Sequence, residues 1–223
     1  MDEALEREAR RVYLRYSIEV VEGLGFCPYA ERARLDGHTA ELVVPEAVPT
    51  DEQVGARVEE LADMRSLEVG VVILPRLELG AVGLGRWVEV LRKQHAARRS
   101  GHAVVAIEGF HPAGALDASS PERLTAFVRR SPDPTLQVTR LSALERVRRG
   151  TPTGTAFVDP ALLDLRALEA PRRPLHERIG ELNLETVQRV GPPHVEAMFE
   201  AILRDRDAAY GAIDPSVVRR AST

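Results

Sequence analysis

Two uninterrupted apolar runs constrain the fold of this 223-residue chain more than any other feature of its sequence. Residues 69–74 and residues 103–107 are short, rich in Val and Ile, and separated by an amphipathic segment long enough for a helix. Runs of this kind are typical of strands covered on both faces, which occur where helices pack on a sheet. We therefore expect an α/β fold in which both runs are central strands.

Two further segments raise the expected sheet to about four strands. Residues 41–44 and the alternating residues 135–141 have strand composition. Thr50 is a plausible N-cap for the helix that follows it. Helices are also expected at residues 3–22, where Gly23 and Gly25 end the helix, and at 84–98, 121–128 and from about 142.

The composition changes after Gly150, where a Thr, Pro and Gly-rich stretch follows. We expect residues 1–150 to form the α/β domain that carries the candidate site. Residues 151–223 are then a helical C-terminal extension that packs on it, with a short helix from about 159 and longer helices at 175–190 and 193–209.

The net charge and the hydropathy of the chain argue against two classes of protein. The net charge of −4 argues against a nucleic-acid-binding protein, which needs a basic surface. Because no apolar run approaches the roughly 20 residues that span a bilayer, we expect no membrane segment. The charged N-terminal residues contain no apolar signal core, and a single cysteine fits a reducing compartment. We expect a cytoplasmic protein.

The only cysteine, Cys27, lies in Gly-Leu-Gly-Phe-Cys-Pro-Tyr-Ala at residues 23–30. A lone cysteine forms no intramolecular disulfide and cannot supply a multi-cysteine metal site. It is an inert apolar side chain, a reactive thiolate, or a single ligand to a metal or haem. Neighbouring cations lower the pKa of a thiol, and Arg32 and Arg34 are close in sequence. Cys27 is therefore a candidate nucleophile.

His111 is the second candidate, because it follows the apolar strand at residues 103–107 in a Gly-Phe-His-Pro segment. Ligand sites in α/β sheets usually form at the carboxyl ends of strands. A histidine there acts as a general base, orients a thiolate or binds a metal. The alternative is a ring that only hydrogen-bonds the loop backbone. No metal-ligating motif such as His-Glu-x-x-His is present.

Candidate anion-binding residues surround the strand at 135–141. Arg130 and Ser131 lie in the rigid Pro-containing loop before it, and Arg140 lies within it. A guanidinium is suited to a carboxylate or phosphate, so these three residues predict a small anionic molecule as the partner. The alternatives are an arginine that caps the preceding helix and a strand arginine that faces solvent.

Three segments, in this order, resemble an uncharacterised bacterial family classed as a domain of unknown function. Its motifs are Gly-Leu-x-x-Cys-Pro-aromatic-Ala, Phe-His-Pro and Arg-Ser-Pro-x-Pro-Thr-Leu. They correspond here to residues 23–30, 110–112 and 130–136. The resemblance covers roughly residues 5–190, and it implies candidate positions without implying a reaction.

This chain departs from the family pattern at several polar positions. Lysine, acidic, asparagine, histidine and glutamate residues common in the family are replaced here by Glu31, Ala113, Ala126, Arg129, Gln137 and Leu141. Either this member has changed its substrate, or it keeps the fold without the activity.

Three hypotheses follow. The first is a cytoplasmic enzyme of unknown reaction in which His111 takes the proton of Cys27 and the thiolate attacks a small anionic molecule held by Arg130 and Ser131. The second is a binding protein: a haem or metal module that uses His111 or Cys27, or an adaptor that binds a protein partner or a second copy through residues 175–209. The third is a non-catalytic, structural member of the family. The sequence identifies no cofactor.

Overall fold

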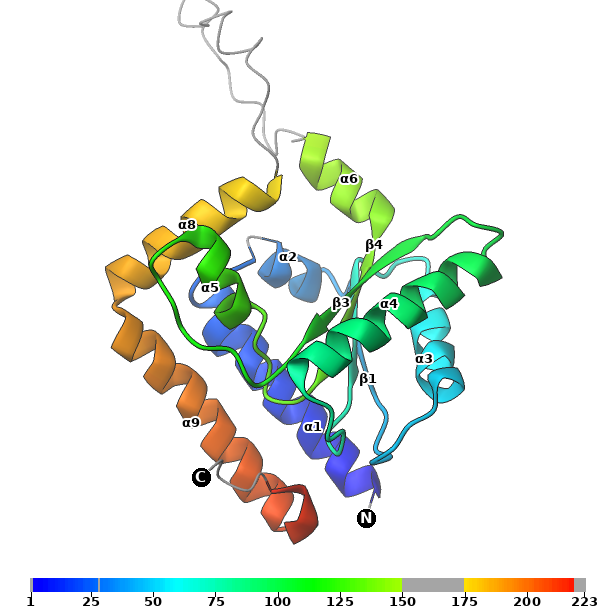
Figure 1. Ribbon diagram of the computed structural model, residues 1–223, viewed down its shortest axis with the longest axis horizontal. Coiled ribbons are helices and arrows are strands. Elements are labelled where there is room, and N and C mark those ends of the chain that lie inside the picture. The colour runs from blue at the N-terminus through cyan, green and yellow to red at the C-terminus, as the bar shows by residue number, and fades with distance from the viewer. Residues whose placement is uncertain (1, 28, 150–174, 219–223) are drawn as a thin grey trace, which may run out of the picture.

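A four-stranded mixed sheet forms the centre of the computed structural model, which describes residues 2–27, 29–149 and 175–218 (Figure 1). The strand order is β1 (Thr39–Val43), β2 (Val69–Ile73), β4 (Thr135–Arg140) and β3 (Val105–Phe110). β1 and β2 are parallel, whereas β4 is antiparallel to both of its neighbours. The predicted α/β fold with a helical C-terminal region is confirmed.

The prediction that residues 103–107 form a central strand is wrong. β2 is central, but β3 lies at the edge because β4, the last strand in the sequence, pairs between β2 and β3. Val105 and Ile107 are buried because α4 (Ala81–Arg98) packs on one face of β3. The apolar run at residues 103–107 therefore indicates that a helix covers the strand. It does not indicate a central position in the sheet.

Two helices, α3 (Asp51–Asp63) and α4, cover one face of the sheet and form the largest apolar core with it (Figure 1). The predicted cap of α3 is confirmed. The Thr50 hydroxyl accepts a hydrogen bond from the Gln53 backbone N–H at 3.2 Å, and the Gln53 side chain accepts one from the Thr50 N–H at 2.8 Å. This reciprocal pair satisfies two donors that the first turn of a helix leaves unpaired.

The opposite face is covered by α1 (Asp2–Tyr16) and α9 (Pro192–Gly211), which lie side by side (Figure 1). Arg11 and Arg15 of α1 both donate to the carboxylate of Asp205 in α9, at 2.8–2.9 Å. These hydrogen bonds, that of Arg11 above all, lower the pKa of Asp205 to about 2. The two helices are thus joined by charge as well as by apolar contact.

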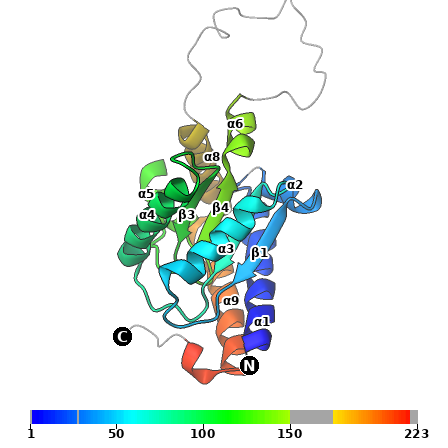
Figure 2. The ribbon, with the colours of Figure 1, turned by 90° about the vertical axis from the view of Figure 1, so that its right-hand side faces the viewer.

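The remaining helices extend this second layer. The expected helix at residues 3–22 continues beyond α1 as a π-helical segment, η1 (Ser17–Glu22), and α2 (Ala30–Leu35) follows. α5 (Pro121–Val128) packs on α8 (Leu175–Val190), which precedes α9, and Figure 2 shows α5 and α8 beside each other. α6 (Leu141–Arg149) continues from β4, and the 3₁₀ turn η3 (Pro215–Val217) follows α9.

The C-terminal helices pack against the rest of the fold within the described residues. α8 contacts α5, and α9 contacts α1 and η1, so much of the surface expected at residues 175–209 for a partner is used within the chain. The boundary expected at residue 150 and the short helix expected from about 159 lie outside the described residues.

A buried ion pair joins α9 to the loop before β4. The carboxylate of Asp133 accepts hydrogen bonds from Arg206 Nε at 2.7 Å and from the Tyr210 hydroxyl at 2.6 Å. The side chains of Arg206 and Asp133 are only 4% and 2% exposed. Arg206 also donates to the Pro75 carbonyl, which follows β2. One guanidinium therefore connects α9 to two strands of the sheet.

Loss of this pair should destabilise the whole fold. Asp133→Asn removes the buried counter-ion of Arg206 and leaves only the partly exposed Asp207, and we expect a loss of about 3–5 kcal/mol in the free energy of unfolding, measured by urea denaturation. The matched control is Asp207→Asn, because Asp207 contacts the same guanidinium but is 32% exposed. The control should cost less than about 1 kcal/mol. Equal losses in the two variants would contradict this assignment.

Candidate functional site

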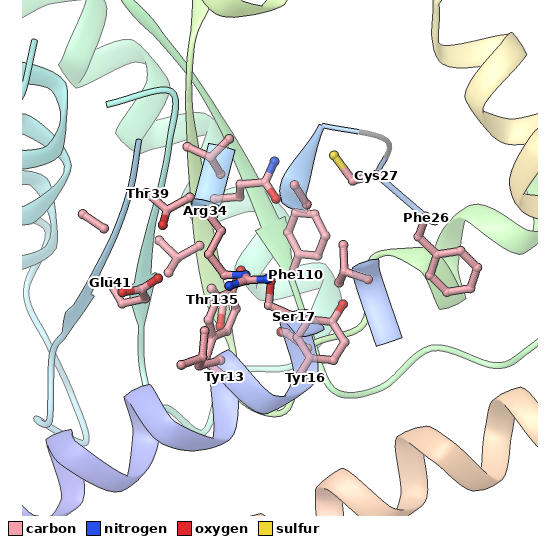
Figure 3. A pocket seen from close by; sticks show the side chains of 18 of the residues that line it. Tyr13, Tyr16, Ser17, Phe26, Cys27, Arg34, Thr39, Glu41, Phe110 and Thr135 are labelled. Atoms are coloured by element: carbon pink, nitrogen blue, oxygen red, sulfur yellow. The ribbon is translucent and has the colours of Figure 1, made fainter. Parts of the chain in front are cut away.

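A cavity of about 180 Å³ lies between the sheet and the segment formed by α1, η1 and α2 (Figure 3). Its lining is mainly apolar, and it includes Val69, Val71 and Phe110. The polar or ionisable lining residues come from six separate segments and are Tyr13, Tyr16, Ser17, Cys27, Arg34, Thr39, Glu41, Ser131, Thr135 and Gln137. An apolar cavity with a few convergent polar groups is the usual form of a small-molecule site.

The turn after α1 brings Cys27 to the cavity. In η1 the helix widens, and the Gly23 N–H donates to the Ile18 carbonyl, five residues earlier, at 3.0 Å. A Cβ at Gly23 would lie 2.5 Å from the Glu19 carbonyl oxygen, and Gly25 has a φ of +66°. Both positions therefore require glycine. Single π-helical turns of this kind occur frequently at functional sites.

The helix α2 begins directly after this turn, and the sequence analysis did not predict this helix.

Burial raises the pKa of the Cys27 thiol, and the nearby Glu22 carboxylate raises it further. The backbone N–H groups of Tyr29 and Ala30 lower it, but the net direction is upward. The surroundings of Cys27 thus favour the neutral thiol over the thiolate.

The two arginines expected to activate Cys27 are engaged elsewhere. Arg34 donates from Nε and a terminal nitrogen to both oxygens of Glu22, at 2.9 and 2.8 Å. Arg32 donates to Glu68 at 2.9 Å. Neither guanidinium therefore lowers the pKa of the Cys27 thiol.

Glu41 and Tyr13 lie in the same cavity, and sequence reasoning did not single out either of them. Burial raises the pKa of the Glu41 carboxyl, and Arg10 and its own backbone N–H lower it in part. Burial also raises the pKa of the Tyr13 phenol, with contributions from Tyr16, Glu41 and Cys27. Within the described residues, Glu41 makes no ion pair and the Tyr13 hydroxyl makes no hydrogen bond. The only sequence signal was a glutamate within a strand.

Glu41 and Cys27 lie on opposite sides of the cavity in the view of Figure 3, with Arg34, Ser17 and Phe110 between them. In this view a guanidinium, a hydroxyl and an aromatic ring therefore lie between the carboxyl and the thiol. A ligand that fills the cavity meets a carboxyl on one side and a thiol on the other.

His111 does not line this cavity. Its Nδ1 accepts a hydrogen bond from the Ala113 N–H at 3.0 Å, which assigns the proton to Nε2, and Nε2 donates to the Leu79 carbonyl at 3.0 Å. His111 lines a second pocket between α4 and β3, together with Arg92 and Glu108. Within the described residues no interaction joins it to Cys27. The structure does not bring the predicted Cys–His pair together.

Arg130 lies outside the cavity as well. Its Nε donates to the Pro112 carbonyl at 3.1 Å, a terminal nitrogen donates to Glu196 at 2.7 Å, and its guanidinium carbon lies 3.9 Å from the ring centroid of Phe199. The side chain fixes α9 against the loop before β4. Because its donors are used within the fold, nothing in its contacts supports the predicted role in substrate binding.

Arg140 closes the C-terminal end of α3 and does not reach the cavity. Its guanidinium donates to the carbonyls of Ala62, Met64 and Leu67 at 2.8–2.9 Å. Carbonyls at the end of a helix lack intrahelical partners, which explains this role. Of the three predicted anion-binding residues, only Ser131 lines the cavity, and its hydroxyl donates to the Asp133 carbonyl.

Each of the three motifs nevertheless contributes to the cavity wall. The Cys-Pro segment supplies Cys27, the Phe-His-Pro segment supplies Phe110, and the Arg-Ser-Pro segment supplies Ser131 and Thr135. The three motifs therefore lie at one cavity. Some of the residues that line it, however, are sequence neighbours of the residues that were predicted. Phe110 faces the cavity where His111 was expected.

Clusters of metal-ligating side chains and membrane-spanning helices are absent from the part of the chain that the structure describes. No group of three or more His, Cys, Asp or Glu side chains there could hold a metal ion. No helix there is both long enough and apolar enough to cross a membrane.

The family described as "Protein of unknown function (DUF1415)" has a model that matches residues 13–160. The match covers more than half of the chain and contains every residue that lines the cavity. The chain belongs to this family, so the predicted membership of a family of unknown function is confirmed. Neither the curated proteins nor the solved structures contain a match.

The reactivity of Cys27 tests its protonation state directly. Because Cys27 is the only cysteine, the pH dependence of iodoacetamide alkylation reports its pKa without a background. We expect a value above about 8.5 in the folded protein and about 8.5 in the urea-denatured chain, which is the matched control. His111→Ala should leave the folded profile unchanged. A folded value at or below that of the denatured chain would contradict the account, as would a profile that shifts in His111→Ala.

Glu41 should lower stability at neutral pH. Because its folded pKa is raised, the unfolded state ionises first, and stability falls as pH rises from about 4.3 through the folded pKa. We expect Glu41→Gln to be about 0.5–2 kcal/mol more stable than wild type at pH 7, with a smaller difference at pH 4, in urea denaturation. Glu60→Gln, in an exposed pair with Arg57, should change stability by less than about 0.5 kcal/mol. A Glu41→Gln protein less stable than wild type at pH 7 would contradict the assignment.

Proposed function

We propose that this member of a family of unknown function is an enzyme that acts on a small molecule in the cavity, with Cys27 as the reacting group. The observation that supports this most is the convergence of all three motifs on one cavity that contains the only thiol of the chain. Motifs that only stabilised the fold need not contribute residues to one shared cavity.

Two backbone N–H groups beside Cys27 favour its ionised form, although burial opposes it. The N–H groups of Tyr29 and Ala30 stabilise the charge of a thiolate. In the reaction the Cys27 proton passes to solvent, the thiolate sulfur bonds to an electrophilic centre of the substrate, and a group on that centre leaves with the bonding electron pair.

Two parts of the sequence-based hypothesis do not enter this proposal. His111 is bound to the Leu79 carbonyl and the Ala113 N–H, so it is not the base. Arg130 and Arg140 are bound within the fold, so they give no reason to expect an anionic substrate. We also propose a cytoplasmic location, supported by the presence of a single cysteine in the sequence.

A non-catalytic binding protein is the second candidate, and the raised pKa of Cys27 favours it. A neutral thiol is a weak nucleophile, so the cavity of such a protein would hold a ligand without reacting with it. A haem or metal module has less support, because both ring nitrogens of His111 are engaged and no cluster of metal-ligating side chains is found in the described residues.

Metabolite profiling tests the enzyme proposal without knowledge of the substrate. Purified wild-type protein is incubated with a small-molecule extract of cells, and mass spectrometry follows compounds that disappear or form. We expect conversion by wild type, at least a hundredfold slower conversion by Cys27→Ser, and retained conversion by His111→Ala, with folding of each variant checked by circular dichroism.

Two outcomes would contradict the proposal. Equal conversion by Cys27→Ser and wild type would show that the reaction does not need the thiol. Binding of a compound by wild type with no conversion would favour the second candidate, the binding protein.

A further inference from the structure

We propose that the molecule bound in this cavity carries a protonated amine, held by the carboxylate of Glu41 on the side opposite Cys27. This inference rests on the proposed function, because it assigns the substrate class of the same cavity. It replaces the anionic molecule expected from Arg130, Ser131 and Arg140.

The balance of charge in the cavity is the first argument. Two charged side chains line it, Arg34 and Glu41. The Arg34 guanidinium is neutralised by the bidentate hydrogen bonds to Glu22, whereas Glu41 makes no ion pair within the described residues. An ionised Glu41 therefore adds one negative charge at the cavity, which only Arg10, outside the cavity lining, offsets in part. A cation on the ligand relieves this charge, and an anion adds to the repulsion.

The cavity neighbours of Glu41 include groups that can accept hydrogen bonds from such a cation. Arg10 on α1 is the basic residue whose charge acts on Glu41, but it is exposed and lies 3.5 Å from Glu6. Tyr13 on α1 and Thr39 on β1 line the cavity with neutral hydroxyl groups. An ammonium group has three N–H donors and no acceptor, and a carboxylate with nearby hydroxyl oxygens provides the acceptors it needs.

The distribution of side chains sets the form of the ligand. Val69, Val71 and Phe110 line the cavity, and Glu41 and Cys27 lie on opposite sides of it (Figure 3). A ligand with its amine at Glu41 therefore places apolar atoms against these walls and its reacting centre toward Cys27. The carboxyl acts as a positioning group for the reaction.

The pH dependence of amine binding follows from the same groups. Besides Glu41, the titratable groups that line the cavity are Tyr13 and Tyr16 from α1, Arg34 from α2 and the Cys27 thiol, and Arg10 on α1 is the cation whose charge acts on Glu41. Of all these groups, Glu41 is the first to ionise as pH rises above about 4.3, because burial raises the pKa of Tyr13, Tyr16 and Cys27. Amine affinity should therefore increase as pH rises through the folded pKa of Glu41 in wild type and remain constant over the same pH values in Glu41→Gln.

Charged thiol reagents test the proposal without knowledge of the substrate. Aminoethyl, hydroxyethyl and sulfonatoethyl methanethiosulfonate differ mainly in charge. In each reaction the Cys27 thiolate attacks the sulfenyl sulfur, the new disulfide forms, methanesulfinate leaves, and the thiol proton passes to the buffer. Intact mass spectrometry gives the rate at the single cysteine. Each rate is divided by that for the urea-denatured chain, which removes the intrinsic reactivity of the reagent.

We expect the corrected rate with the aminoethyl reagent to exceed that with the sulfonatoethyl reagent at least tenfold in the wild-type protein. Glu41→Gln should bring this ratio close to one. Glu31→Gln is the matched control, because Glu31 is an exposed carboxylate on α2 that is closer to Cys27 in sequence but does not line the cavity. The control should keep the wild-type ratio. A preference for the sulfonate, or a cation preference that survives Glu41→Gln, would overturn the proposal.

A second measurement removes the thiol from the comparison. In the Cys27→Ser protein, n-butylammonium should raise the melting temperature more than butyrate at equal concentration, and Glu41→Gln in this background should abolish the difference. Greater stabilisation by butyrate would overturn the proposal and favour an anion at Arg34.

The two proposals fail separately. If Cys27→Ser abolishes conversion of a metabolite but no cation preference is found, the enzyme proposal stands and the proposal of an amine-containing ligand is wrong. If the cation preference depends on Glu41 but Cys27→Ser converts substrate as wild type does, the amine site stands and the catalytic role of Cys27 is wrong.

Discussion

The buried pair of Asp133 and Arg206 fixes the arrangement on which the cavity depends. It joins α9 to the loop that leads into β4. This strand is the last of the four in the sequence, but it lies between β2 and β3 in the sheet. Asp205, the residue before Arg206, then binds Arg11 and Arg15 and so positions α1 beside α9. Because α1 continues into η1, the position of Cys27 follows from contacts made by the C-terminal helix.

Local patterns of the sequence predicted the elements well and their arrangement less well. The cap at Thr50 and the apolar run at β2 depend on neighbours in sequence, and both predictions agree with the structure. The place of β3 at the sheet edge depends on β4, which is inserted between β2 and β3 from about 25 residues later in the chain. No local period contains that information, because a helix on one face and a central position both favour an apolar strand.

The candidate site shows the same division between position and role. The motifs around Cys27, His111 and Arg130 do mark the cavity, yet Phe110 lines it where the sequence favoured a histidine, and of the predicted pair Arg130 and Ser131 only Ser131 does. A strand turns successive side chains to opposite faces, and a shift of one residue decides which of them meets the cavity. Residue type alone could not tell a guanidinium that binds a ligand from one that holds α9.

The groups that remain at the cavity are those the fold does not use. Glu41 has no ion-pair partner and Tyr13 no hydrogen bond within the described residues, and burial disfavours the charged forms of Glu41 and Cys27. Such groups lower stability, and natural proteins retain them mainly where function requires them. This contrast with the fully bonded Arg206 and Asp133 is the main reason to assign function to the cavity and not to the buried ion pair.

The central claim is that ligands enter this cavity, and amide NMR of the isotope-labelled full chain tests it most directly. A small-molecule extract of cells is added to the protein, and the shifts of assigned amides are followed. The account predicts changes centred on Cys27, Glu41, Phe110 and Ser131. Changes centred on Arg92, Glu108 and His111 in the second pocket, with the first group unaffected, would contradict it.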